Sequence, residues 1–137
     1  MDTTALLQSI YRACREKRLA ELLSLLSDEF KFTVHLPEDT LDGGARPRSK
    51  AETALLLHDF MNTYDVLLFE PGPIIVTDDR ASAQPEVRFR HKKTGNVLEA
   101  KLVHSWHVED GKARALEERH DLETLRAYAR SISEAGG

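Results

Sequence analysis

The amino-acid sequence predicts an α+β domain in which helices near the N-terminus pack against an antiparallel sheet. Apolar residues recur every three or four positions in the first part of the chain, which is typical of amphipathic helices. From Pro71 onward they alternate with polar residues between glycine-containing turns, which is typical of strands joined by hairpins. Helices segregated from an antiparallel sheet define the α+β class.

Length and composition indicate one domain of ordinary globular type. The chain has 137 residues, of which 41% are hydrophobic and 31% are charged, so it can bury a sizeable core. The formal net charge is −4, and the basic residues form no stripe along the sequence. We therefore expect a single domain over residues 1–137 and no nucleic-acid partner.

The single cysteine and the short apolar runs bear on location. Cys14 has no second cysteine with which to form an intramolecular disulfide, and its place on a helical stripe predicts core packing. The first residues lack a basic region followed by an apolar block, so no signal peptide is expected. No apolar run is long enough to span a bilayer. The sequence thus predicts a cytoplasmic protein with no membrane partner.

Two helices are expected near the N-terminus. Residues 3–17 carry an apolar stripe, and Asp2 or Thr3 could cap the start of this helix. A short second helix follows and should end near Ser27. The stripes consist of Leu6, Ile10, Ala13 and Cys14 in the first helix and of Leu19, Leu22, Leu23 and Leu26 in the second.

A strand, a loop and a third helix should follow. Apolar and polar residues alternate over residues 30–36, which predicts a strand with one buried face. Residues 37–48 are rich in turn formers and predict a loop. Residues 49–52 form a capping box that should open the third helix. That helix would carry Leu55, Leu56, Phe60, Met61 and Tyr64.

The rest of the chain predicts a four-stranded antiparallel meander and a closing helix. Strands are expected at residues 74–77, 84–91, 97–108 and 113–120. The turns that join the last three should lie at residues 93–96 and at Asp110-Gly111. Asp121 could cap a last helix that carries Leu122, Leu125, Tyr128 and Ala129.

Four stretches in this order resemble a known superfamily. They are LLSLLSDEF, TVHLP, GGARPRSKAE and SWHVEDGKARALEERHD, and together they span roughly residues 5–121. The chain resembles the nuclear transport factor 2-like, ketosteroid isomerase-like superfamily in its SnoaL-like branch. The resemblance implies a cone-shaped fold with a curved antiparallel sheet wrapped around the N-terminal helices and an internal cavity. It also implies a homodimer, often formed through the outer face of the sheet.

The resemblance does not select one activity, because the superfamily includes isomerases, polyketide cyclases, dehydratases, epoxide hydrolases and non-catalytic members. The isomerases place a basic carboxylate at the end of the first strand, where this chain has only Val34, His35 and Leu36. We expect His35 to point away from the apolar face. The isomerases also use a tyrosine on the first helix, but Ile10 falls at that position and Tyr11 is one residue away. Steroid-isomerase chemistry is therefore not expected.

The predicted strand over residues 97–108 has one apolar face. That face holds Leu98, Ala100, Leu102, His104, Trp106 and Val108, and we expect it to line the concave side. By the resemblance, His104 falls about where the isomerases place a second acid. His107 should lie on the opposite face, because residues three apart on a strand point to opposite sides. The two histidines therefore cannot bind one metal ion together, and we predict neither a metal nor a cofactor.

The returning strand has two alternative registers. A two-residue turn at Asp110-Gly111 would point Glu117, Arg119 and Asp121 inward. A three-residue turn with a bulge, over residues 109–111, would instead point Leu116, Glu118 and His120 inward. The second alternative is favoured because it buries Leu116, the large apolar residue of this strand.

In the favoured register four side chains meet on the concave face, namely those of His104, Trp106, Glu118 and His120. His120 or His104 would exchange a proton with a ligand, and Glu118 or Asp121 would orient the imidazole. Asp121 could instead cap the following helix. Glu118 could instead only pair with a histidine, without a role in proton transfer. Residues expected to contact the ligand are Trp106, Leu116, Tyr11, Phe32 and Phe60. The resulting hypothesis is a domain that binds a small apolar molecule and transfers protons, with a non-catalytic binding module as the alternative.

Overall fold

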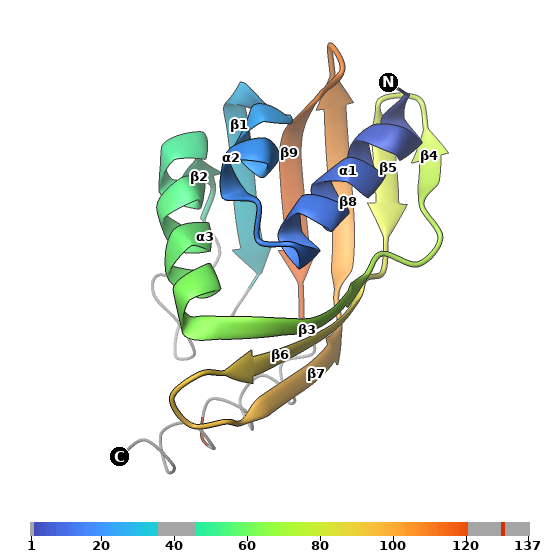
Figure 1. The fold of residues 1–137 in the computed structure, drawn as a ribbon. Helices are drawn as coiled ribbons and strands as arrows, with labels where there is room; N and C mark the ends of the chain where they lie inside the picture. The colour runs from blue at the N-terminus through green and yellow to red at the C-terminus, as the bar shows by residue number, and fades with distance from the viewer. Residues whose placement is uncertain (1, 36–45, 121–129, 131–137) are drawn as a thin grey trace.

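The computed structural model describes residues 2–35, 46–120 and 130 (Figure 1). The closing helix predicted after Asp121 lies outside the described residues. The helices are α1 (Thr3–Arg15), α2 (Leu19–Ser24) and α3 (Lys50–Thr63). The strands are β1 (Leu26–His35), β2 (Arg48–Ser49), β3 (Tyr64–Glu70), β4 (Ile75–Thr77), β5 (Arg80–Ala83), β6 (Glu86–His91), β7 (Val97–Lys101), β8 (Val103–Glu109) and β9 (Lys112–Arg119).

The N-terminal helices form largely where the apolar spacing predicts them. Asp2 caps α1, because its Oδ1 accepts a hydrogen bond from the backbone N–H of Ala5 at 2.7 Å. Three members of the predicted stripe are buried and Cys14 is partly buried. The helix α2 is shorter than predicted and ends at Ser24. Leu26 already belongs to β1, so the predicted boundary near Ser27 was wrong.

The capping box at α3 is confirmed. Ser49 Oγ accepts from the N–H of Glu52 at 3.1 Å, and the carboxylate of Glu52 accepts from the N–H of Ser49 at 3.1 Å. The outer side of the helix is less buried than its leucines suggest, since Leu55 is 70% exposed. Tyr64, predicted as helical, instead begins β3.

Three strands were missed from the sequence. The strand β3 follows α3 without a helix-breaking residue, and its apolar residues are consecutive rather than alternating. In β5 the only apolar residues are two alanines that alternate with polar residues, so the alternation of hydrophobicity is weak. The two-residue β2 lies at the end of the stretch predicted as a loop and pairs with β1. In each case pairing with a neighbouring strand decided the structure.

The strands form one curved, open sheet in two parts. The six-stranded part has the order β2-β1-β9-β8-β5-β4, and the three-stranded part has the order β3-β6-β7. The pairing is antiparallel throughout, except between β1 and β9, which run parallel. At the bend between the two parts, the N–H of Leu102 donates to the carbonyl of Pro85 at 2.9 Å. Figure 1 shows α1 and α2 across the hollow side of the six-stranded part.

The hairpin between β8 and β9 combines features of both predicted registers. Its turn has two residues, because Val108 pairs with Ala113, and both Asp110 (φ 53°) and Gly111 (φ 75°) are left-handed as a type I′ turn requires. The favoured three-residue turn was therefore wrong. However, the register shifts immediately afterwards, because His107 pairs with Ala115 and leaves Arg114 as an extra residue.

This bulge turns the rest of β9 in the predicted direction. Leu116 lies opposite Trp106, and Glu118 lies opposite His104. The parallel partner β1 is irregular at the same level, between Leu26 and Lys31. The guanidinium of Arg114 spans this irregularity and contacts the Oε2 atom of Glu29 at 2.5 Å.

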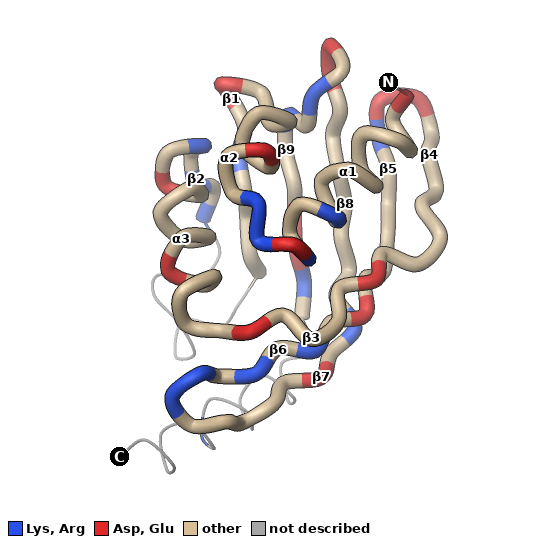
Figure 2. The backbone as a smooth tube through the Cα atoms, viewed as in Figure 1, with Lys and Arg blue, Asp and Glu red and all other residues tan. Residues whose placement is uncertain are grey.

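The core lies between the helices and the hollow face of the sheet. The predicted inward face of β7 and β8 is confirmed, since its residues are buried apart from the half-buried Ala100. Charged residues of both signs are distributed along the described backbone, with a basic group at the turn between β6 and β7 (Figure 2). None of the helices that the structure describes is long and apolar enough to cross a membrane.

Removing the α3 cap should destabilise the protein. Ser49→Ala deletes the acceptor for the N–H of Glu52, and we expect the free energy of unfolding to fall by about 1 kcal/mol. Urea denaturation measures this value, and Ser82→Ala on the exposed side of β5 is the matched control. Equal stability of the two variants would contradict the role given to the cap.

Candidate functional site

Five side chains from three elements meet on the hollow side of the sheet and form what we call the inner polar cluster. Tyr11 lies on α1, and both His104 and Trp106 lie on β8. Glu118 lies on β9, and His120 directly follows the end of that strand. His104 and Trp106 are two residues apart and therefore point to the same side of their strand. The register of β9 brings Glu118 directly opposite His104.

The cluster is one continuous chain of hydrogen bonds. The indole N–H of Trp106 donates to the hydroxyl oxygen of Tyr11 at 2.9 Å, and this oxygen lies 2.6 Å from Nδ1 of His104. Nε2 of His104 lies 2.7 Å from Oε1 of Glu118. The other carboxylate oxygen, Oε2, lies 2.8 Å from Nε2 of His120. Glu118 therefore bridges the two imidazoles.

The hydrogen-bonded side chains differ in how much solvent they meet. The side chain of His104 is 3% exposed, whereas those of Glu118 and His120 are 16% and 15% exposed. Both ring nitrogens of His104 are also occupied within the cluster. Of these three side chains, Glu118 and His120 are therefore the less buried ones.

The surroundings of Glu118 keep it ionised. Burial alone would raise its pKa, but hydrogen bonds with His104 and His120 outweigh burial and hold the pKa well below its ordinary value. Burial raises the pKa of Tyr11, although the hydrogen bond from Trp106 opposes this effect. At neutral pH the cluster therefore contains a partly buried carboxylate and a neutral phenol.

Cys14 adds no nucleophile beside this carboxylate. Burial raises the pKa of its thiol to about 12, and the negative charge of Glu118 acts in the same direction. The thiol is therefore protonated at neutral pH. Its packing against the core agrees with the structural role predicted for it.

Ring packing orients the cluster. The rings of Tyr11 and His104 are nearly parallel, with centroids 5.6 Å apart and an interplanar angle of 12°. Trp106 meets both rings edge-on at 5.9 Å. Phe69 of β3 packs on Tyr11 from 5.8 Å. The imidazole of His104 is thus held by packing as well as by hydrogen bonds.

The structure brings most of the predicted site residues to the same side of the sheet. Tyr11, Trp106, Leu116 and Phe32 are buried there. Phe60 is only partly buried; it stacks on Tyr64 at 5.0 Å and meets Phe89 edge-on at 4.8 Å, and it is connected to Tyr11 through Phe89 and Phe69. Asp121 lies outside the described residues.

The sequence pointed to Tyr11 as a ligand contact but not as the link between Trp106 and His104. Tyr11 lies four residues after Leu7 and three before Cys14, so helical spacing could have placed it on the buried stripe. Nothing in the sequence indicates that its hydroxyl meets residues more than 90 positions away. That contact depends on how α1 lies across β8.

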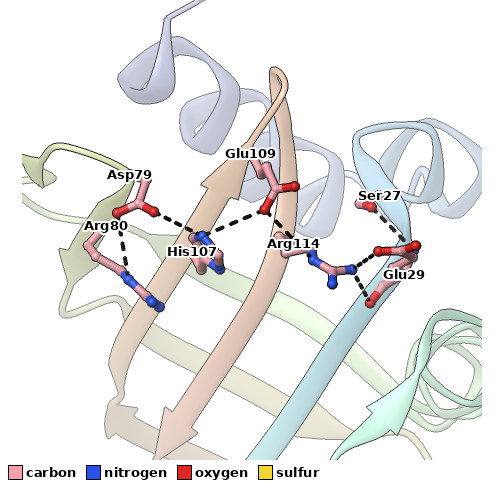
Figure 3. A network of polar contacts seen from close by, with 7 residues as sticks. All are labelled: Ser27, Glu29, Asp79, Arg80, His107, Glu109 and Arg114. Atoms are coloured by element: carbon pink, nitrogen blue, oxygen red, sulfur yellow. Dashed lines mark hydrogen bonds and ion pairs between the residues drawn. The ribbon is translucent and has the colours of Figure 1, made fainter.

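The outer face of the sheet carries separate polar contacts. His107 points there, with Nε2 at 3.1 Å from Oδ2 of Asp79 and 4.0 Å from Oε2 of Glu109 (Figure 3). His35 also points outward, as predicted, and contacts Glu117 at 3.0 Å. The predicted separation of His104 from His107 is confirmed. Among the described residues, no group of three His, Cys, Asp or Glu side chains is arranged to hold a metal ion.

A depression of about 340 Å³ lies on this outer face, and Trp106 is the one residue of the inner polar cluster that lines it. Side chains that line it include Ile75, Arg80, Ser82, Ser105, His107 and Glu117. The internal cavity implied by the resemblance remains a prediction.

Sequence comparison assigns the chain to a family. The profile of the SnoaL-like domain matches residues 7–116, and the chain belongs to this family. No functionally curated protein matches the sequence.

Solved structures confirm the fold. The chain is similar to an NTF2-like protein from Burkholderia xenovorans, with a TM-score of 0.75 and 17% identity over 92% of this chain and 94% of the other. It is similar to an LEH-like epoxide hydrolase from M. tuberculosis, with a TM-score of 0.74 and 12% identity over 96% and 91%. It is also similar to IdmH from Streptomyces antibioticus, provisionally described as a polyketide cyclase, with a TM-score of 0.75 and 18% identity over 93% and 98%. Identities this low show a shared fold only.

The ionised state of Glu118 predicts a pH-dependent contribution to stability. A carboxylate whose folded pKa lies below its ordinary 4.5 stabilises the protein above that value and loses this effect as pH falls toward the folded pKa. Glu118→Gln should therefore lower the free energy of unfolding by about 2–3 kcal/mol at pH 7. The difference from wild type should shrink at pH 3.5.

Urea denaturation at the two pH values measures this effect. Glu117→Gln is the matched control, because Glu117 is the preceding residue of β9 and points to the outer face. We expect a smaller loss from the control. A Glu118→Gln effect that stays constant from pH 7 to 3.5 would contradict the ionised state assigned to Glu118.

Proposed function

We propose that the protein binds a small, mostly apolar molecule beside His120 and transfers a proton on it without a cofactor, as an isomerase, cyclase or dehydratase does. The observation that carries the proposal is the pair of His120 and Glu118, which is partly exposed and is held from behind by His104. A histidine oriented by an ionised carboxylate is a suitable general base and acid near neutral pH.

The proton transfer can be written from the geometry of this pair. When Nε2–H of His120 donates to Glu118, the Nδ1 lone pair of the neutral imidazole is available to a ligand. Nδ1 would take a proton from a carbon next to a carbonyl group. The C–H electron pair would form a C=C bond as the π pair of the carbonyl group moves onto its oxygen, which gives an enolate, and the imidazolium formed would be stabilised by Glu118. Return of the proton to another atom of the ligand completes an isomerisation.

The roles of the two histidines differ in this proposal. His120 exchanges the proton because it is the more exposed imidazole. His104, also predicted as a proton-exchanging residue, holds Glu118 in place from the buried side. Asp121 remains a candidate for the same orienting role or for a helix cap.

The ligand class follows from the charge and composition of the surrounding residues. Trp106, Leu116 and Phe32 supply apolar surface on this side of the sheet. The ionised carboxylate of Glu118 would repel an anionic ligand, so a neutral carbonyl compound fits best. Similarity to proteins named as an epoxide hydrolase and a polyketide cyclase supports an enzyme-like function of this general kind. The expected cytoplasmic location belongs to the same proposal.

Exchange of carbon-bound protons for deuterium tests the activity directly. In D₂O, neutral cyclic ketones such as 1-indanone, 2-tetralone and 2-cyclohexenone report abstraction of an α-proton as loss of a ¹H NMR signal. We expect the protein to accelerate exchange of at least one of them. His120→Ala should lower the protein-dependent rate by about 100-fold or more, the usual contribution of a general base.

The control and the alternatives are read in the same assay. His107→Ala removes a histidine from the outer face and should leave the exchange rate unchanged. Thermal stabilisation by a ketone without accelerated exchange would favour the non-catalytic binding module instead. Exchange that persists in His120→Ala would contradict the role given to this residue.

We also propose that the protein forms a homodimer through the outer face of its six-stranded sheet. This face has a depression, the exposed side chain of Ile75, and charges of both signs, so it could pair with a second copy of itself.

Ala115→Arg on this face should shift the protein toward monomer in light scattering after size-exclusion chromatography. Ala51→Arg on the exposed side of α3 is the matched control and should leave the mass unchanged. A monomeric wild-type protein would contradict this proposal.

A further inference from the structure

We infer that Tyr11 is a positioning residue that donates its only hydroxyl proton to His104 and so holds His104 as the neutral tautomer with its proton on Nε2. The inference rests on donor and acceptor chemistry in the inner polar cluster. It does not require the proposed proton-transfer activity.

The first step concerns the hydroxyl oxygen of Tyr11. The indole nitrogen of Trp106 is a donor only, so the contact at 2.9 Å makes this oxygen an acceptor. The hydroxyl group carries one proton, which it can donate to one acceptor. Among the described residues, the other hydrogen-bonding partner of the hydroxyl is Nδ1 of His104 at 2.6 Å.

The second step compares the two ways of sharing a proton between Tyr11 and His104. If Nδ1 carried a proton and donated it to Tyr11, the hydroxyl proton would be left without an acceptor among the described residues, in a side chain only 2% exposed. Buried polar groups without a partner are strongly disfavoured. If Tyr11 donates to an unprotonated Nδ1, all three groups are satisfied. The second arrangement therefore applies.

The third step carries this proton pattern to Glu118. A neutral imidazole with an unprotonated Nδ1 has its proton on Nε2, which lies 2.7 Å from Oε1 of Glu118. His104 thus always presents a donor to the carboxylate. Oε1 is held by this bond, while Oε2 faces Nε2 of His120.

Two functional consequences follow. Tyr11 has no second proton to offer, so it cannot donate a hydrogen bond to the carbonyl of a ligand while it bonds to His104. The superfamily's isomerases, which this chain resembles, use a helix-one tyrosine for that purpose. In addition, His120 is left as the one imidazole of the cluster with a nitrogen that bonds to none of the described residues.

Nitrogen NMR of the protein labelled with ¹⁵N-histidine tests the inference. Long-range ¹H–¹⁵N correlations at pH 7.5 distinguish the two neutral tautomers and the imidazolium by their nitrogen shifts, and the signals lost in His104→Gln identify His104. We expect the wild-type His104 to show an unprotonated Nδ1 and a protonated Nε2. In Tyr11→Phe the Nδ1 shift should move toward the protonated value, because Nδ1 loses its donor while Nε2 still donates to Glu118.

A second variant and a control complete the test. Trp106→Phe removes the donor that makes Tyr11 an acceptor, so the hydroxyl can accept from Nδ1 and the Nδ1 shift of His104 should again move toward the protonated value, even if Tyr11→Phe does not fold. His107→Gln on the outer face should leave the His104 signals unchanged.

A protonated Nδ1 on wild-type His104 would overturn the inference, and so would unchanged His104 shifts in both Tyr11→Phe and Trp106→Phe. Because no ligand is present, these results are independent of the ketone exchange assay.

Discussion

The structure depends most on the extra residue in β9. Arg114 has no partner residue opposite it on β8, and this single insertion reverses which side chains of the following strand face the core. Without it, the two-residue turn at Asp110-Gly111 would bring Ala115 instead of Leu116 opposite Trp106, and Glu117 instead of Glu118 opposite His104. Either register brings a glutamate opposite His104, and the observed one is stabler because it buries a leucine rather than an alanine opposite Trp106. The salt bridge from Arg114 to Glu29 ties the bulge to the irregular part of β1.

The same register creates the chemistry of the inner face. Glu118 is a partly buried carboxylate, which is costly unless its oxygens are hydrogen-bonded. His104 and His120 meet that requirement, and Tyr11 and Trp106 complete the chain from the helix side. Full pairing explains how an ionised group is tolerated beside an aromatic core. It also separates the buried imidazole, which organises the cluster, from the more exposed one, which could act on a ligand.

Much of the fold could be predicted because local patterns determine it. The cap at Asp2, the capping box at Ser49 and the turn at Asp110-Gly111 each depend on a few neighbouring residues. The alternation that points His104 inward and His107 outward also follows from strand geometry alone. Strands β3 and β5 were missed because their residues show no alternation or too little apolar contrast. Such segments form strands because they pair with neighbouring strands of the sheet.

The sequence by itself determined the fold class, the family, the helix starts and the face on which His104 and Trp106 lie, because these properties reside in short-range periodicity and spacing. Only the tertiary structure decided that Arg114 bulges, that Glu118 lies opposite His104, and that Tyr11 joins Trp106 to His104. The physical reason is the same in each case. A strand register is set by burial summed over paired strands, and a contact across 93 positions forms only when helix and sheet pack together.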